Sequence, residues 1–148
     1  MEAKNKMLLG AYYGGIAITG SGTTAVHALS YPLGGKYHIP HGVSNAILFA
    51  HVMEFNRSAC ETELAELCDE VYPELSGKSV GEKSCYIIQK IAEIVKTTNI
   101  PTDLSQFGIT AEDLDFLVEA GSQQTRLLVN NKQELSKDDI REIYKKVL

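Results

Sequence analysis

The stretch VHALSYPLGGKYHIPHG, from Val26 to Gly42, decides how the rest of the sequence is interpreted. It places His27 and His41 fourteen positions apart, with glycines and prolines between them. We expect His27 on a short helix that Pro32 ends, because the residue before a proline is pushed out of helical geometry. The glycines and Pro40 then predict a loop, and His41 should lie at or just before the first turn of a helix that follows.

Two interpretations of this histidine pair stay open on spacing alone. Neutral imidazole binds first-row divalent metals, and a loop with Gly34, Gly35 and Pro40 could fold back and bring the two rings together. Two histidines fourteen residues apart also occur often by chance. Spacing by itself therefore favours structural or surface roles over a metal site.

Composition restricts the class of protein. A chain of 148 residues with 44% hydrophobic residues is long enough to bury one core, so we expect one domain over residues 1–148. The formal charge of -5 argues against nucleic acid as a partner. No apolar run reaches the ~18 residues that a membrane span needs, and no signal peptide is evident. We expect a cytoplasmic protein.

Helix signals recur along the whole sequence, which predicts an all-α domain of about seven helices. Residues 2–18 carry an apolar stripe at helical spacing, which predicts a helix with one buried face. Later helices are expected to begin at capping boxes. These pair Ser58 with Glu61, Ser79 with Glu82, Thr110 with Asp113, and Ser136 with Asp139.

The segment NIPTDLSQFGIT, residues 99–110, is expected to be a connector within the domain, because it is short and carries the apolar residues Ile100, Leu104 and Phe107. The three cysteines, Cys60, Cys68 and Cys85, show no C-x-x-C spacing and are odd in number. They predict reduced and mostly buried thiols.

A family resemblance changes how the two histidines are interpreted. The run GIAITGSGTTAVHALSYPLGGKYHIPHGVSNAILFAHVMEFN resembles the metal-site signature of the iron-containing, or group III, alcohol dehydrogenases. In that family a helix-borne histidine is followed by L-G-G, an aromatic residue and P-H-G-x-x-N-A. The matching residues are His27, Leu33, Gly34, Gly35, Tyr37, Pro40, His41, Gly42, Asn45 and Ala46. The last residues, ELSKDDIREIYKKVL, are similar to the closing helix of the family, so the resemblance covers essentially the whole chain.

The resemblance implies that His27 and His41 are two of four protein ligands to a divalent metal, usually iron and sometimes zinc. The other two family ligands, an aspartate and a histidine, precede the first motif, where this sequence has no aspartate and no other histidine. The glycine-rich turn of the family's nucleotide-binding domain has no counterpart here either. We expect the chain to correspond to the C-terminal part of such an enzyme, with weak metal binding and no turnover alone.

For an intact enzyme the resemblance implies hydride transfer between an alcohol and the nicotinamide of NAD(P), with the metal as a Lewis acid. By the same analogy Ile18 and Thr23 would line the substrate pocket. Tyr31 takes the place of a histidine that lies near the nicotinamide in many members, and a phenol is the poorer proton shuttle at neutral pH. Asn45, one turn beyond His41, is expected to orient that imidazole or to brace the loop.

The remaining histidines are interpreted as structural. His38 is expected to face solvent or brace the loop, and His51 lies almost three turns beyond His41, too far to share a metal. The alternative to a dehydrogenase fragment is a non-catalytic helical interaction module or one subunit of a split dehydrogenase. The apolar first helix would then leave an exposed patch that favours a homodimer, or association with the N-terminal domain of the family.

Overall fold

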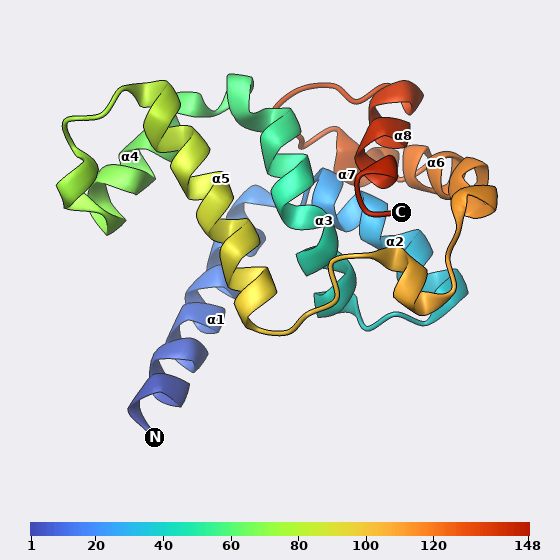
Figure 1. The fold of residues 1–148 in the computed structure, drawn as a ribbon, viewed down its shortest axis with the longest axis horizontal. Helices are drawn as coiled ribbons and strands as arrows, with labels where there is room; N and C mark the ends of the chain where they lie inside the picture. The colour runs from blue at the N-terminus through green and yellow to red at the C-terminus, as the bar shows by residue number, and fades with distance from the viewer.

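The computed structural model describes residues 1–148, and every regular element in it is helical (Figure 1). The eight α-helices are α1 (Glu2–Ser21), α2 (Ala25–Tyr37), α3 (His41–Asn56), α4 (Glu61–Val71), α5 (Val80–Thr97), α6 (Leu114–Ser122), α7 (Thr125–Leu128) and α8 (Lys137–Lys145). Short 3-10 turns occur at η1 (Arg57–Ala59), η2 (Pro73–Leu75), η3 (Leu104–Phe107) and η4 (Ala111–Asp113). The all-α prediction is confirmed, with one short helix more than expected.

The main hydrophobic core is built around α2, which packs against α3 and α6, while α8 covers α6 and part of α3. Leu29 and Leu33 of α2 have no exposed surface, and neither has Tyr144 of α8. The Tyr144 hydroxyl donates a hydrogen bond of 2.6 Å to the carbonyl oxygen of Leu29, which fixes α8 to the middle of α2. Burial raises the pKa of Tyr144 far above its ordinary value, so its hydroxyl keeps the proton that it donates.

A second, smaller core lies between α4 and α5. Its buried residues are Cys60, Leu64, Cys68, Ile87 and Ile88. Cys60 and Cys68 are buried, Cys85 is half-buried, and all three thiols are free, which confirms the prediction for the cysteines. Helix α5 also packs against α3, so this second core continues from the helix that begins with His41.

The prediction that Pro32 ends the first histidine's helix is wrong. Pro32 is buried inside α2, which continues to Tyr37 and ends where His38 takes a left-handed conformation with φ of 55°. A proline inside a helix costs ~3 kcal/mol because it removes one backbone hydrogen bond and crowds the preceding turn. The buried side chains of Leu29 and Leu33, on either side of Pro32, offset that cost. The predicted loop is therefore only residues 38–40.

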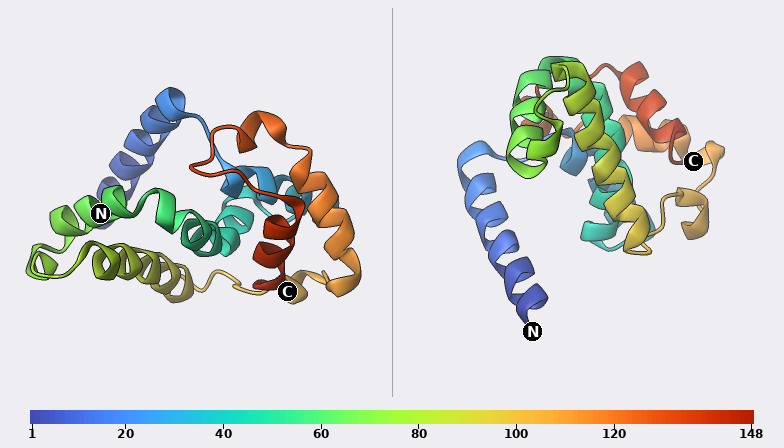
Figure 2. Two further views of the ribbon diagram at one scale, coloured as in Figure 1. Left: turned by 90° about the horizontal axis from the view of Figure 1, so that it is seen from above. Right: turned by 60° about the vertical axis from the view of Figure 1, so that its left-hand side comes forward.

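Helix α1 forms as predicted, but the prediction that it buries an apolar stripe is wrong. None of its twenty residues is buried, and Met7, Leu8, Tyr12 and Ile16 are all exposed. The right-hand view in Figure 2 shows α1 projecting away from the other helices. Its apolar side chains thus form the exposed patch that the sequence also predicts.

Three of the four predicted capping boxes are confirmed. They are those of Ser79 with Glu82, Thr110 with Asp113, and Ser136 with Asp139, the second one preceding the 3-10 turn η4. The box of Ser58 with Glu61 is wrong, because Ser58 lies within the turn η1 and α4 begins after Cys60. Glu61 accepts a hydrogen bond from Arg57 instead.

The connector between α5 and α6 is tied into the main core, as expected. Leu104 is fully buried, and Ile100 and Phe107 pack against the core. The backbone N–H of Leu104 donates to the carbonyl of Val147 at 2.7 Å, which joins the connector to the end of the chain.

Close contact between α6 and α2 yields a test of the core. A Cβ atom at Gly121 would lie 2.8 Å from Leu29 Cδ2 and 3.4 Å from the Tyr144 hydroxyl, whereas one at Gly35 would meet nothing within 4 Å. We predict that Gly121→Ala lowers the free energy of unfolding by about 1–3 kcal/mol, because the core is overpacked. Gly35→Ala, the same change in an open helical position, should raise it by about 0.5–1 kcal/mol. Urea denaturation measures both, and equal effects of the two variants would contradict this description of the core.

Candidate metal centre

Helices α2 and α3 bring the two predicted histidines together. His27 lies in the first turn of α2 and His41 is the first residue of α3. The left-handed turn at His38 reverses the chain between them, and the N–H of Ile39 donates to the carbonyl of Leu33 at 3.3 Å. Because α3 then runs back along α2, the two imidazole rings come to lie with their centroids 5.1 Å apart and their planes inclined by 53°.

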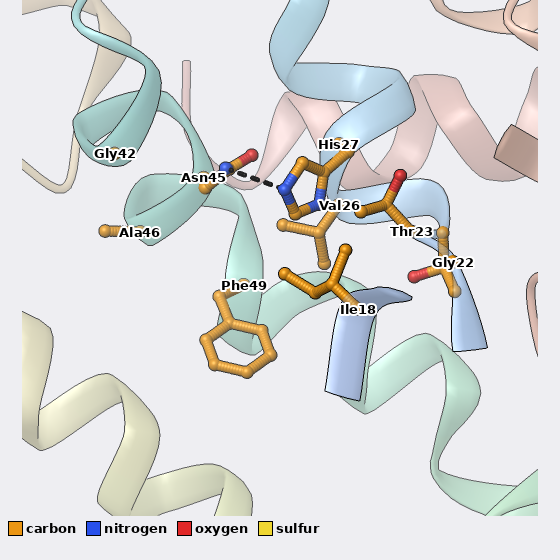
Figure 3. A pocket seen from close by; sticks show the side chains of 10 residues that line it. Ile18, Gly22, Thr23, Val26, His27, Gly42, Asn45, Ala46 and Phe49 are labelled. Atoms are coloured by element: carbon orange, nitrogen blue, oxygen red, sulfur yellow. Dashed lines mark hydrogen bonds between the residues drawn. The ribbon is translucent and has the colours of Figure 1, made fainter. Parts of the chain in front are cut away.

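Asn45 lies between the two rings, one turn beyond His41. Its amide nitrogen Nδ2 is 3.0 Å from Nε2 of His41 and 3.4 Å from Nε2 of His27, so both Nε2 atoms face the same group. Figure 3 shows the Asn45 side chain directed from α3 toward the His27 ring. A ring that accepts from this amide carries its proton on Nδ1 and presents the lone pair of Nε2 to the amide.

Burial favours the neutral form of His27. Its ring is half-buried, and desolvation lowers its pKa from the ordinary value, with a further lowering from the charge of His41 beside it. The neutral imidazole is also the form that binds a metal. The surroundings of His27 therefore hold it in a ligand's protonation state at neutral pH.

The donor set fits part of a metal site. Two imidazoles with convergent Nε2 atoms suit iron or zinc, and the buried Asn45 oxygen Oδ1 has no hydrogen-bond partner, so this polar group is not yet satisfied. No cluster of three or more His, Cys, Asp or Glu side chains in the structure could hold a metal ion. The residues present therefore supply two strong donors, and further ligands would have to come from outside them.

A pocket of about 410 Å³ adjoins His27 (Figure 3). Its walls come from the end of α1, the turn before α2, the first turn of α2 and one face of α3. The lining residues are Ile18, Gly22, Thr23, Thr24, Val26, His27, Gly42, Asn45, Ala46 and Phe49. The turn itself requires Gly22, which has a left-handed φ of 73° and lies against Asn130.

The residues predicted for the substrate pocket divide into two groups. Ile18 and Thr23 line the pocket beside His27. Tyr31 lies outside this lining but next to the other histidine, with its ring centroid 6.2 Å from that of His41. Val26, Ala46 and Phe49 were not predicted. The spacing of Gly42, Asn45, Ala46 and Phe49 on α3 is the signal that could have found the last two, because residues three and four apart share a helix face.

The other two histidines do not join the pair. His38 is exposed in the turn that ends α2, and His51 is half-buried further along α3. Desolvation lowers the pKa of His51, helped by the positive charge of Lys146. The structural roles expected for these two residues stay predictions.

The chain is similar to known dehydrogenases in sequence and in structure. The chain is 37% identical to a long-chain-alcohol dehydrogenase of Geobacillus thermodenitrificans over 97% of its own length and 36% of that protein. It is 31% identical to a 4-hydroxybutyrate dehydrogenase of Clostridium kluyveri, over 99% of the chain and 39% of that protein. An alcohol dehydrogenase structure from Oenococcus oeni superimposes with a TM-score of 0.83 and 27% identity, over 90% of this chain and 35% of the other.

The chain thus spans little more than a third of the length of the curated relatives that it matches. No helix in the structure combines the length and the hydropathy that crossing a bilayer requires. The model of the family described as "Fe-containing alcohol dehydrogenase family, C-terminal" matches residues 1–148. The protein belongs to the iron-containing alcohol dehydrogenase family, and its residues correspond to the C-terminal domain of that family.

Proposed function

We propose that this chain is the C-terminal metal-binding part of an NAD(P)-linked alcohol dehydrogenase, in which His27 and His41 contribute two ligands to a divalent metal. Iron is the first expectation, since the family is iron-containing, and zinc is the alternative. The convergence of both Nε2 atoms on one amide, beside a pocket, carries the proposal. Relatives named as alcohol and hydroxyacid dehydrogenases support alcohols and aldehydes as substrates.

Each residue of the centre has a distinct part in this proposal. His27 and His41 offer the lone pairs of Nε2, and the Asn45 amide keeps both Nε2 atoms directed at one point until an ion takes those lone pairs. When bound, the ion supplies a Lewis acid that lowers the pKa of an alcohol oxygen. Ile18 and Thr23 would contact the substrate and exclude water from one side. Tyr31, beside His41, could hydrogen-bond a group at the metal.

Hydride transfer belongs to the whole protein in this proposal. A nicotinamide site and the remaining ligands are not found among these residues, so we expect the chain by itself to bind a metal weakly and to show no turnover. The exposed apolar side chains of α1 support association with a further domain or a second copy. A split dehydrogenase, or a non-catalytic helical interaction module, is the alternative that this surface favours.

Replacing the two histidines tests the metal site. We predict that His27→Ala and His41→Ala each weaken Zn²⁺ and Fe²⁺ binding by about tenfold to a hundredfold. Changing a residue that only supports a metal ligand already has an effect of this size, so removing a ligand should reach it. His38→Ala and His51→Ala are matched controls and should leave the affinity unchanged, because neither ring adjoins the pair. Calorimetric titration of the purified chain measures the affinities. Unchanged binding in both His27→Ala and His41→Ala would remove these residues from the metal site.

Substituting Asn45 tests its position between the rings. We predict that Asn45→Asp strengthens Zn²⁺ binding by about tenfold or more, because a carboxylate there would complete a set of two histidines and one carboxylate. Asn45→Ala should leave Zn²⁺ binding within about threefold of the unmodified chain, because the amide donates to the same Nε2 lone pairs that the ion would take and so adds nothing to the bound state. Equal affinities of the two variants would show that position 45 does not face the ion. Circular dichroism checks that α3 is retained.

Reconstitution tests the assignment to a dehydrogenase. We predict no NAD(P)-linked alcohol oxidation by the chain alone and measurable oxidation when it is combined, by mixing or by fusion, with the nucleotide-binding part of a relative such as the Geobacillus enzyme. His41→Ala in the same assembly should abolish that activity. An assembly that forms but is inactive with iron and with zinc would favour the non-catalytic interaction module.

A further inference from the structure

We propose that the histidine pair is one half of a four-imidazole site that a second copy of this chain completes, so that a single zinc ion joins two copies face to face. The inference rests on the proposed function, because it takes His27 and His41 as metal ligands. It goes further in naming a second copy of the chain as the partner that supplies the two missing donors.

The number of donors in one copy is the first step. Both Nε2 atoms lie within 3.4 Å of the Asn45 amide nitrogen, so an ion that takes the place of this amide meets both lone pairs. Zinc in proteins is almost always bound by four ligands when its site is closed. No third His, Cys, Asp or Glu joins the pair. Two copies related by a twofold axis present the same pair twice and so reach four imidazoles.

The side chains around the pair leave it open to a partner. Tyr31 follows His27 by one turn of α2, while Asn45 and Phe49 follow His41 by one and two turns of α3, and residues four apart share a helix side. We call these five residues the histidine face. His41 is exposed, and Tyr31 and Phe49 are 39% and 40% exposed. A second copy would therefore reach the pair without unfolding any element, and it would cover two aromatic rings.

Charge favours contact at the histidine face over contact elsewhere. The chain has a formal net charge of -5, so two copies repel each other at long range. A twofold contact also places each charged side chain close to its own like-charged copy. The histidine face contains no Lys, Arg, Asp or Glu, and neither does the lining of the adjoining pocket. A zinc ion at its centre adds two positive charges between two negatively charged chains.

The exposed side chains of α1 offer a different kind of contact. The hollow near Met7 and Leu8 is apolar, but its lining contains no histidine, cysteine or carboxylate that could bind a metal. Association through α1 would therefore not depend on zinc. A stable interface buries about 1,200–2,000 Å² in total, and the rings of Tyr31 and Phe49 supply only a small part of this. Association through the histidine face should accordingly require the ion.

A zinc titration of the whole chain tests the inference. Native mass spectrometry counts ions and chains in each species, and sedimentation velocity gives the mass in solution. We expect a species of two chains and one zinc ion that stops increasing at half an equivalent of zinc and is lost when EDTA is added. His27→Ala and His41→Ala each remove two ligands from a pair of copies. Each should weaken this dimer by about a hundredfold, tenfold for each ligand. His38→Ala removes an exposed histidine from the neighbouring turn and should change nothing.

Asn45→Asp separates a shared ion from an ion held by one copy. A carboxylate at this position adds a third donor next to both Nε2 atoms of the same chain. We expect this variant to bind one zinc ion per chain and to lose the zinc-dependent dimer. Asn45→Ala adds no donor, so it should keep one ion for two chains.

Three more variants locate the contact. Phe49→Gln adds no charge but removes apolar surface from both faces, so it should weaken the dimer by about tenfold. Phe116→Gln is the matched control, because Phe116 is 43% exposed on another helix, and it should have no effect. Leu8→Lys places a charge among the apolar side chains of α1 and should leave the zinc-dependent step unchanged.

The outcomes distinguish this inference from the proposed function. One zinc ion on a single chain, bound in a way that still needs His27 and His41, would overturn the shared site and leave the proposed metal ligands standing. A zinc-dependent dimer that Leu8→Lys abolishes and Phe49→Gln leaves intact would likewise overturn the histidine face. Zinc binding that depends on neither histidine would overturn the proposed function as well.

Discussion

The burial of α2 on both sides of Pro32 is the constraint on which the rest of the structure depends. Leu29 and Leu33 have no exposed surface, and the Tyr144 hydroxyl binds the Leu29 carbonyl from the opposite end of the sequence. These contacts carry the helix past Pro32 to Tyr37 despite the missing backbone donor. The length of α2 in turn sets where the chain reverses. If α2 ended at Tyr31, α3 would begin at a different place relative to α2, and His41 would not face His27.

The same constraint explains why the two histidines are held in one arrangement. His27 is fixed because α2 is buried on both sides of it, at Val26 and Ala28, and His41 is fixed because α3 begins at that residue. Asn45 then occupies the space between the Nε2 atoms with an amide that can serve both. Two preset donors still bind a divalent ion weakly, since the charge and the geometry of the missing ligands contribute much of the affinity. In the proposed function the domain therefore supplies the orientation of two ligands, and other residues supply the rest of the coordination.

Local signals predicted the fold better than they predicted the exact elements. Capping boxes such as Ser79 with Glu82 predict a helix start correctly, because the two side chains satisfy backbone donors within one turn. Ser58 with Glu61 has the same spacing, but Arg57 binds Glu61 and the helix starts later. Pro32 departs from its local prediction for a similar reason, since tertiary burial outweighs a local preference. At the site, the resemblance pointed to His27 and His41, whereas Phe49 needed the helix face to be traced beyond the motif.

Helix α1 shows what hydrophobic periodicity alone leaves open. Its pattern correctly indicates an apolar face, but a pattern does not say which surface covers that face, and here all of its residues are exposed. The point matters for the pocket, because Ile18 belongs to α1 and forms one of its walls. Few contacts fix the position of that wall. The Gly22 N–H donates to the Ile18 carbonyl at 2.8 Å, and the Asn130 amide donates to the neighbouring Thr23 carbonyl at 3.2 Å. Whatever packs against α1 would therefore also adjust the width of the pocket beside His27, so association of this domain and the shape of that pocket are expected to be coupled through Ile18.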